Sequence, residues 1–342
     1  MRQLTLRAAG DLAWEDVPDP ALTDQDSALV RPLAIARCDL DAPMAAAAIF
    51  PAPFPVGHEV VAEVVEVGAD VREHRPGERV VVPFQVSCGR CVACAERRFA
   101  ACHPHRAPAG AAFGFGAAGG GHGGAVAERL VVPHADHMLC TAPSELSDAA
   151  ACTLPDNALD GYRAVGPQLA ARPGADVLIV GGAGPSIGLY AGAMARALGA
   201  STVRYVDRDA GRCANAERLG ADVTQLDGEW PRRLERAPIV VENSGEPAGL
   251  ACAIRSTDDY GTLTPVAIHF AAETPLPLLS MYTKGVTVEL GRADSRRHLD
   301  AVLALAADRR FDPSAIDTTI VPFDDAREAW LAPATKLVVT GA

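Results

Sequence analysis

The stretch "GADVLIVGGAGPSIGLYAGAMARALGA" constrains the fold most, because it places a strand, a glycine turn and a helix in direct succession. Val177–Val180 is an apolar, β-branched run, and the turn after it spaces Gly182, Gly184 and Gly188 as G-x-G-x-x-x-G. Apolar residues then recur at the helical spacing i, i+3, i+4 and i+7: Ile187, Tyr190, Ala191, Met194 and Leu198. The stretch predicts a βα unit whose turn lets the backbone approach a phosphate.

The rest of the chain divides by the period of its apolar residues. Strand-like runs follow the helix at intervals, at 201–207, Ile239–Val241, Thr262–Ala267 and Val286–Leu290. Strands that alternate with helices predict a parallel, doubly wound sheet. Before about residue 140, short β-branched runs such as "EVVAEVVEVGADV" are separated by Pro and Gly, and the last fifty residues ("TTIVPF", "KLVVT") are again strand-rich.

These patterns predict an α/β protein of two domains, as the length of 342 residues also suggests. A β-rich, barrel-like or rolled domain is expected over 1–150 and 292–342, and the doubly wound domain over 151–291. The glycine-rich stretch Gly110–Gly124 is expected to be a flexible loop over a site.

The turn "GGAGPSIG" is the candidate nucleotide site, and it offers Gly182, Gly184, Pro185, Ser186, Ile187 and Gly188. Asp207 ends the next strand, 19 residues after Gly188. A carboxylate there accepts both ribose hydroxyls and repels a 2′-phosphate, which favours NAD over NADP. Because Arg208 lies beside it, NADP is not excluded as the cofactor. The alternative to a nucleotide site is a βαβ turn that binds no ligand.

Four cysteines form a compact motif: Cys88, Cys91, Cys94 and Cys102, with C-x2-C-x2-C-x7-C spacing. Four thiolates on one loop can close a tetrahedron around Zn²⁺ and leave no open position, which predicts a structural zinc in a lobe at 87–103. An iron–sulfur cluster and a pair of disulfides are the alternatives.

Composition limits the partners and the compartment. The net charge of −12 disfavours nucleic acid and anionic membrane. No apolar run reaches the roughly 18 residues that span a bilayer, and the start "MRQLTLRAAG" shows no signal peptide. Nine cysteines without export signals fit a reducing, cytoplasmic compartment.

Five features appear in one order along the chain: Cys38, the Gly-His-Glu of 57–59, the four-cysteine loop, the glycine turn and a C-terminal "KLVV". In this order the chain resembles the zinc-containing medium-chain alcohol dehydrogenases over nearly its whole length. The resemblance implies a GroES-like catalytic domain, a Rossmann coenzyme domain and a homodimer or homotetramer. It also implies two zincs per chain and hydride transfer between NAD(H) and an alcohol, aldehyde or ketone.

The resemblance also assigns roles. It implies that Cys38, His58 and Asp156 bind a catalytic zinc, with Cys152 as the alternative to Asp156. Glu59 would be an exchanging fourth ligand. Asp41 would hydrogen-bond His58, with a solvated loop carboxylate as the alternative.

Two further residues receive roles near the cofactor. Asp160 takes the place of a threonine that lies near the nicotinamide in the family. Arg292 is a candidate contact to the cofactor phosphates, with a surface arginine as the alternative.

The chain departs from the family where a proton relay is expected. Leu40 and Pro43 stand in place of a Ser or Thr and a His. Asp39, Asp160 and His122 are the candidates to take the proton, with a solvated or structural residue as the alternative for each. This leaves two other functions open: a reductase of activated C=C or C=N bonds, and a nucleotide-binding zinc protein without turnover. The substrate pocket is expected near Leu40, Phe113, Phe115 and His122.

Overall fold

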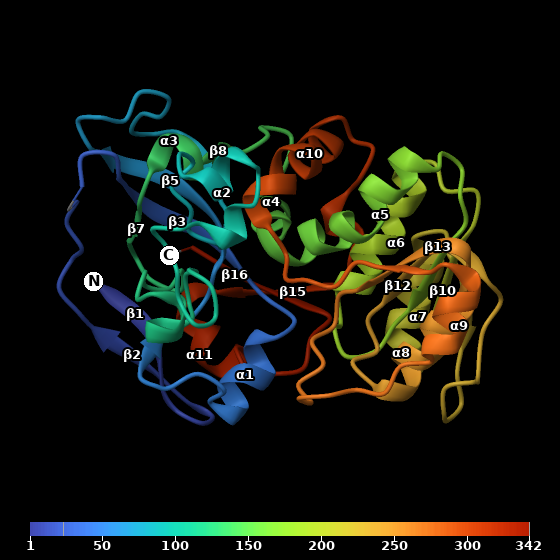
Figure 1. Ribbon diagram of the computed structural model, residues 1–342. Coiled ribbons are helices and arrows are strands. Elements are labelled where there is room, and N and C mark those ends of the chain that lie inside the picture. Colours follow the sequence, from blue (N-terminus) through green and yellow to red (C-terminus); the bar gives the residue numbers. More distant parts are fainter. Residues whose placement is uncertain (23, 342) are drawn as a thin grey trace. The chain divides into compact units, whose positions relative to one another are not determined.

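The computed structural model describes residues 1–22 and 24–341, and it divides into two compact units. The first unit holds Met1–Leu159, Asp294–Ser314 and 318–341, and the second holds Asp160–Ala293 with Ala315–Asp317. Figure 1 labels the elements of both units.

The second unit is built on a wholly parallel sheet with the strand order β11-β10-β9-β12-β13-β14. Its strands are β9 (Val177–Val180), β10 (Val203–Asp207), β11 (Asp222–Gln225), β12 (Ala237–Glu242), β13 (Thr257–Pro265) and β14 (Thr287–Val288). This is the Rossmann order, in which consecutive crossovers run outward in opposite directions from the β9–β12 pair. The carboxyl ends of these two strands therefore form the crevice in which such folds bind nucleotides.

Helices cover both faces of this sheet. They are α5 (Leu159–Ala171), α6 (Ile187–Ala197), α7 (Ala210–Arg218), α8 (Pro247–Ser256) and α9 (Leu278–Lys284). Side chains alternate along β9: Leu178 packs with Leu250 and Ile254 of α8, whereas Ile179 faces α6. A Cβ added to Gly192 of α6 would lie 3.2 Å from the Ile179 side chain, so a small residue allows this close packing.

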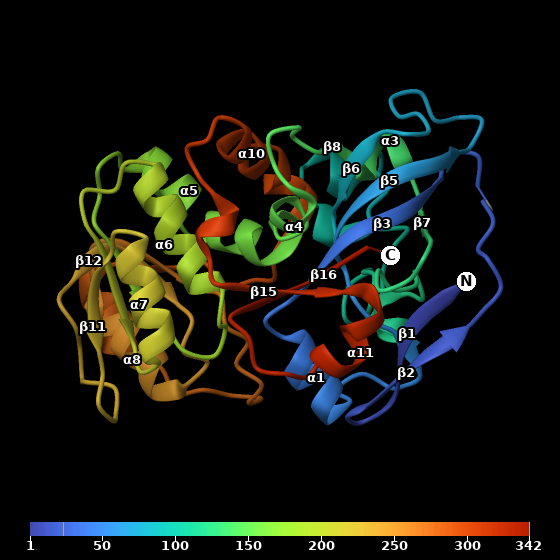
Figure 2. The same cartoon turned by 180° about the vertical axis from the view of Figure 1, so that it is seen from behind.

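The first unit contains two sheets. The larger has the order β15-β16-β3-β5-β6-β8, with β7 paired to β3, and the smaller has the order β2-β1-β4. The larger sheet contains β3 (Ala28–Arg37), β5 (Glu59–Val67), β6 (Arg79–Val82), β7 (Leu130–Val132), β8 (Cys140–Thr141), β15 (Thr318–Pro322) and β16 (Lys336–Thr340). The smaller contains β1 (Arg2–Ala8), β2 (Asp11–Asp16) and β4 (Phe54–Pro55). Figure 2 shows β3, β5 and β6 side by side, and β16 is antiparallel to β3.

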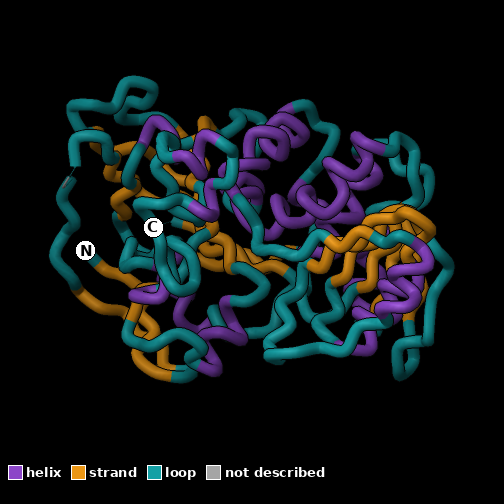
Figure 3. The backbone as a smooth tube through the Cα atoms, in the orientation of Figure 1, coloured by secondary structure: helices purple, strands orange, loops and turns teal. Residues whose placement is uncertain are grey.

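This unit has the β-rich, rolled character that its sequence predicts. Side chains from both sheets, among them Leu4, Ile35, Val60 and Val80, form one buried core. The helices before residue 145 are short: α1 (Asp41–Ala47), α2 (Val92–Ala95) and α3 (Ala135–Met138). Loops make up much of the remainder, as Figure 3 shows in teal.

The C-terminal region contains a helix where the sequence suggested strands. β15 and β16 lie where strands were predicted, but α10 (Ser295–Ala307) precedes them. Leu299, Val302, Leu303 and Ala306 share one buried face at helical spacing, and this local period was overlooked. α11 (Ala326–Ala329) lies between the two strands.

Two short helical segments precede α5 and belong to the first unit. They are α4 (Asp148–Ala151) and a π-helix, Leu154–Ala158. α4 contacts β3, β5 and β16, and the π-helix contacts β5 and β6. These contacts place Asp156 in the β-rich unit, whereas the expected boundary after residue 150 put it in the coenzyme domain.

The helices are short throughout. The longest, α5 and α10, have 13 residues each. Within residues 1–22 and 24–341, no helix has both the length and the apolar character needed to cross a membrane.

Lys284 at the end of α9 is buried and caps α8. Its Nζ donates to the carbonyl oxygens of Ile254 (2.8 Å), Arg255 (3.2 Å) and Thr257 (2.5 Å). Lys284→Met removes these three buried hydrogen bonds, and we expect the second unit to lose about 2–3 kcal/mol of unfolding free energy. Chemical denaturation measures this loss, and Arg233→Met, which removes an exposed cation of the same unit, is the matched control. Equal stability of the two variants would show that the cap contributes nothing.

Candidate active site

Four side chains converge in the first unit where a metal ion was predicted. One donor atom from each of Cys38, His58, Glu59 and Asp156 lies within 4.8 Å of the others. Cys38 follows β3, His58 directly precedes β5, Glu59 is the first residue of β5, and Asp156 lies on the π-helix. The adjacent strands and a helix segment far along the chain thus bring together residues separated by more than a hundred positions.

The two ring nitrogens of His58 face different partners. Nε2 lies 3.1 Å from Asp156 Oδ2, and Nδ1 lies 3.5 Å from Asp41 Oδ1. Among the described residues, Nδ1 is buried and makes no hydrogen bond. Asp41 is itself fixed, since its Oδ2 accepts the Cys38 backbone N–H at 3.0 Å. Nε2 therefore points toward the donor group, with Asp41 behind the ring.

Two aromatic rings enclose His58. The ring of Phe84 lies 5.3 Å from the imidazole between centroids, and the ring of Phe115 lies 5.2 Å away, edge-on. His58 is 1% exposed, so these rings and the strands keep bulk water from its faces.

The buried acids perturb one another strongly. Burial alone would lower the pKa of His58, but the carboxylates of Asp41 and Asp156 outweigh it and raise this pKa to about 9. Burial, together with the charges of Asp156 and Asp41, raises the pKa of the Cys38 thiol. Such a group of donors holds protons in the place of a cation, and a divalent ion would release them.

Glu59, within the same group of donors, is paired with a buried lysine. Lys336 Nζ lies 2.7 Å from Glu59 Oε1 and 2.8 Å from Oε2, and both side chains are fully buried. Burial raises the pKa of Glu59 to about 8, although Lys336 opposes the shift. Sequence reasoning assigned no role to Lys336, yet a lone lysine opening an apolar strand was a readable signal.

The remaining donors suit zinc. A thiolate, an imidazole and a carboxylate, with a fourth position open, form the type of ligand set found in catalytic zinc sites. The buried negative charge and the orientation of His58 by Asp41 fit the same ion. Cys152, the alternative ligand, lies outside this group, and its Sγ donates a hydrogen bond to the Ala149 carbonyl oxygen at 3.3 Å.

The positions expected to relay a proton are occupied by inert side chains. Leu40 is the residue before α1, and Pro43 is exposed within that helix. Asp39 gives its backbone N–H to Asn157 Oδ1 at 3.0 Å. His122 packs against Phe113 and His105, and burial lowers its pKa.

The four-cysteine loop is also assembled. The donor atoms of Cys88, Cys91, Cys94 and Cys102 lie within 4.8 Å of one another, and Cys91 Sγ is 3.5 Å from Cys94 Sγ and 4.0 Å from Cys102 Sγ. Sulfurs around a tetrahedral zinc are about 3.8 Å apart, given Zn–S bonds of about 2.3 Å. None of the nine cysteines, all within the described ranges, forms a disulfide.

Backbone N–H groups also point at these sulfurs. His103 N–H donates to Cys91 Sγ at 3.4 Å and lowers the pKa of that thiol to about 6. Cys88 N–H donates to Cys102 Sγ at 3.3 Å. Such donors favour thiolates, the form that binds a metal.

The glycine turn lies at the carboxyl end of β9 in the second unit. Gly182 has a φ of +151°, and a Cβ there would meet the backbone of Ser244 at 2.8 Å. Pro185 and Ser186 lead into α6, which begins at Ile187, and Asn243 Nδ2 donates to the Gly184 carbonyl at 2.7 Å. A Cβ added to Gly188 would lie 3.4 Å from the side chains of Ile179 and Tyr205, so the glycine lets the helix pack closely on the sheet. The turn is thus shaped as a phosphate-binding turn.

Asp207 is buried at the end of β10 and is already well paired. Its oxygens accept from the Arg212 guanidinium at 2.8 Å twice, from Tyr205 OH at 2.9 Å and from two backbone N–H groups. Burial would raise the pKa of Asp207, but the Arg212 hydrogen bonds lower it. Arg212, in the first turn of α7, was not predicted from the sequence.

Arg208 is engaged by its own neighbours. Its Nη1 pairs with Glu246 at 2.6 Å, and its guanidinium stacks 5.0 Å from the Trp230 ring. Asp160 pairs with Arg163 at 2.5 Å, and Arg292 is exposed in the segment after β14. A pair that sequence reasoning missed, Glu242 and His269 at 3.0 Å, lies where β12 ends.

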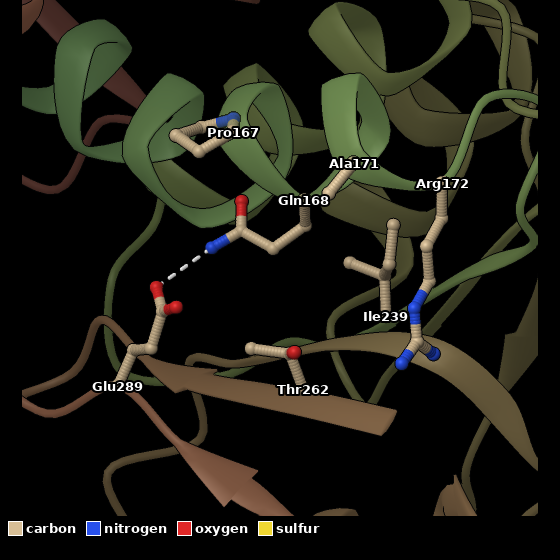
Figure 4. Close-up of a pocket in the computed structure, with 7 residues that line it drawn as sticks. All are labelled: Pro167, Gln168, Ala171, Arg172, Ile239, Thr262 and Glu289. Atoms are coloured by element: carbon tan, nitrogen blue, oxygen red, sulfur yellow. Dashed lines mark hydrogen bonds between the residues drawn. The ribbon is translucent and has the colours of Figure 1, made fainter. Parts of the chain in front are cut away.

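A separate pocket lies between α5 and strands β12 and β13 (Figure 4). Gln168 points across it and donates to Glu289 at 2.8 Å. The pocket opens on a face of the sheet and not at the carboxyl ends of its strands, so it is distinct from the nucleotide crevice.

Comparison with known proteins agrees with both units. Residues 24–144 match the family described as "Alcohol dehydrogenase GroES-like domain", and residues 186–308 match "Zinc-binding dehydrogenase". The Mycobacterium tuberculosis protein described as "Probable zinc-binding alcohol dehydrogenase Rv1895" is 30% identical over 335 residues, which cover 96% of this chain and 84% of that protein. L-threonine 3-dehydrogenase of Streptomyces coelicolor is 32% identical over 303 residues, 84% of this chain and 83% of that protein.

Solved structures share the whole fold. Alcohol dehydrogenase TADH from Thermus sp. ATN1 superposes with a TM-score of 0.88 at 30% identity and covers 99% of both chains. The GroES-like unit, the Rossmann unit and the sequence relatives lead to one assignment. The chain belongs to the zinc-containing medium-chain alcohol dehydrogenase family of oxidoreductases.

Proposed function

We propose that the protein is a zinc-dependent oxidoreductase that transfers hydride between NAD(H) and an alcohol, aldehyde or ketone. The observation that carries this proposal is the buried group of Cys38, His58 and Asp156, with Asp41 behind the histidine. When bound, zinc supplies Lewis-acid polarisation of the substrate oxygen and the nicotinamide supplies the hydride acceptor or donor.

The residues of this group and around it would bind the metal and fix the orientation of its ligands. Cys38, His58 and Asp156 would bind the metal, and Asp41 keeps the His58 ring in one orientation. Lys336 pairs with Glu59, which would be an exchangeable fourth ligand of the metal. The second zinc would be held by Cys88, Cys91, Cys94 and Cys102 and would stabilise their lobe.

The cofactor preference rests on Asp207. Its ionised carboxylate would repel a 2′-phosphate, which supports NAD over NADP, and the paired state of Arg208 reduces its value as a phosphate ligand. The glycine turn from Gly182 to Gly188 would bind the pyrophosphate.

The inert side chains of Leu40 and Pro43 support a second candidate, a reductase of activated C=C or C=N bonds. One substrate panel separates the candidates: alcohols, aldehydes, ketones, L-threonine, an enal and an iminium, followed at the NADH absorbance with NAD and NADP in both directions. Turnover of alcohols and carbonyls is expected. Turnover of only the enal or iminium would establish the second candidate, and no turnover at all would favour a nucleotide-binding zinc protein.

Metal content checks the same proposal without turnover. We expect two zincs per chain in the unmutated protein and one each in Cys38→Ala and Cys94→Ser, with activity lost in the former. One zinc in the unmutated protein would refute the catalytic zinc.

Zinc binding at the catalytic site should strengthen as the pH rises. Below pH 9 the metal has to displace a proton from His58 and another from Cys38, because both pKa values are raised in the metal-free site. Each displaced proton changes the affinity about tenfold per pH unit, so about a hundredfold per unit is expected between pH 6 and 8. Competition with a chromophoric chelator measures it, and Cys38→Ala reports the four-cysteine site alone. The expectation would be contradicted if the difference in zinc binding between the unmutated protein and Cys38→Ala did not change with pH.

We further infer that the chain assembles with copies of itself through the second unit. Leu279 and Tyr282 of α9 are 77% and 85% exposed, and other large apolar side chains of this unit are exposed as well: Tyr260, Ile268, Phe270, Leu278 and Leu290. β14 is the edge of the parallel sheet, with an outer side open to pairing. A second copy of the same surface would cover both features.

Light scattering after size-exclusion chromatography tests this assembly. The unmutated protein should be a dimer or a tetramer, and Leu279→Asp with Tyr282→Asp should give a smaller species. Ile320→Asp, at an exposed apolar position in the first unit, is the control and should leave the mass unchanged. An unmutated monomer would refute the inference.

A further inference from the structure

Asn157 follows the candidate ligand Asp156 and is 1% exposed. Its side chain contacts three groups: Nδ2 lies 3.4 Å from Cys38 Sγ, and Oδ1 accepts from Asp39 N–H at 3.0 Å and from Lys336 Nζ at 2.7 Å. One amide therefore joins the π-helix, the loop after β3 and strand β16.

The contacts of the oxygen fix the direction of the amide. An amide oxygen only accepts and an amide nitrogen only donates, and both groups facing Oδ1 are donors. The NH₂ group must therefore face the sulfur, and an N–H···S hydrogen bond forms whenever Cys38 is a thiolate. The Lys336 ammonium on Oδ1 polarises the amide and strengthens Nδ2 as a donor.

A hydrogen bond to a metal-bound sulfur withdraws electron density from it. The sulfur then donates less charge to the metal, and the metal polarises its open position more strongly. The amide also fixes the position of Cys38, because its oxygen is anchored at two points. Lys336 thereby acts on two sides of the site, on Glu59 directly and on Cys38 through Asn157.

We propose that Asn157 is a positioning residue that tunes the catalytic metal through an N–H···S hydrogen bond to Cys38. The inference rests on the proposed function, because it requires a metal on Cys38. Asn157 would set both the affinity of the site and the Lewis acidity of its ion.

Cobalt(II) substitution of the full-length protein tests this directly, because the sulfur-to-cobalt charge-transfer band reports the electron density on the thiolate. The Cys38 contribution is the difference between the unmutated protein and Cys38→Ala. Asn157→Leu removes the whole network, whereas Asn157→Asp keeps an acceptor for Lys336 and removes the donor to sulfur. In both variants we expect the band to move to lower energy and metal affinity to fall about 10–100-fold.

Thr153, four residues before Asn157, offers the matched control. Thr153→Val removes its buried hydrogen bond to Ala150 O (2.9 Å) and leaves the donor side chains untouched. It should leave the band in place. If the band does not move in either Asn157 variant, this inference is overturned and the proposed catalytic zinc is not. Absence of any Cys38-dependent band in the unmutated protein overturns the catalytic zinc and, with it, the inference.

Discussion

The buried acidic group of the first unit is the constraint on which the site depends. Cys38, Asp41, Glu59 and Asp156 lie together in the interior, where the positive charge that can balance them comes from His58, from Lys336 and, near Asp41, from Arg37. Buried charges are tolerated only when they are paired or bind a metal. The π-helix places Asp156 in this group, and strand β16 places Lys336 there. Both elements therefore bring the opposite charges together.

The two lysines of the chain have related roles. Both Lys284 and Lys336 are buried, and each places one ammonium among several oxygens. Arginine carries the other basic charges, much of it in ion pairs nearer the surface. A compact ammonium with three rotatable donors fits a cavity where acceptors meet from different directions, and a planar guanidinium does not.

Local motifs were readable because their geometry is contained in a few consecutive residues. The cysteine spacing at 88–102 and the strand, turn and helix around Gly182 both fold as expected. The helix α10 was not predicted, because the strand-like runs before and after it hid the helical spacing of its apolar residues. Asn157 and Arg212 were not predicted, because a single polar residue carries no pattern and its partners lie far away in the sequence or across a turn. Lys336 opens an apolar strand, but its partner Glu59 lies 277 residues earlier.

The sequence alone determined the two-unit α/β architecture and the residue types available for two metal sites and a nucleotide turn, because periodicity and spacing are local properties. Only the tertiary structure decided that Asp156 and not Cys152 joins Cys38 and His58, and that Glu59 is held by Lys336. Those choices depend on which side chains of β3, β5, β16 and the π-helix point into one small volume. Long-range packing sets that volume, and no short stretch of sequence records it.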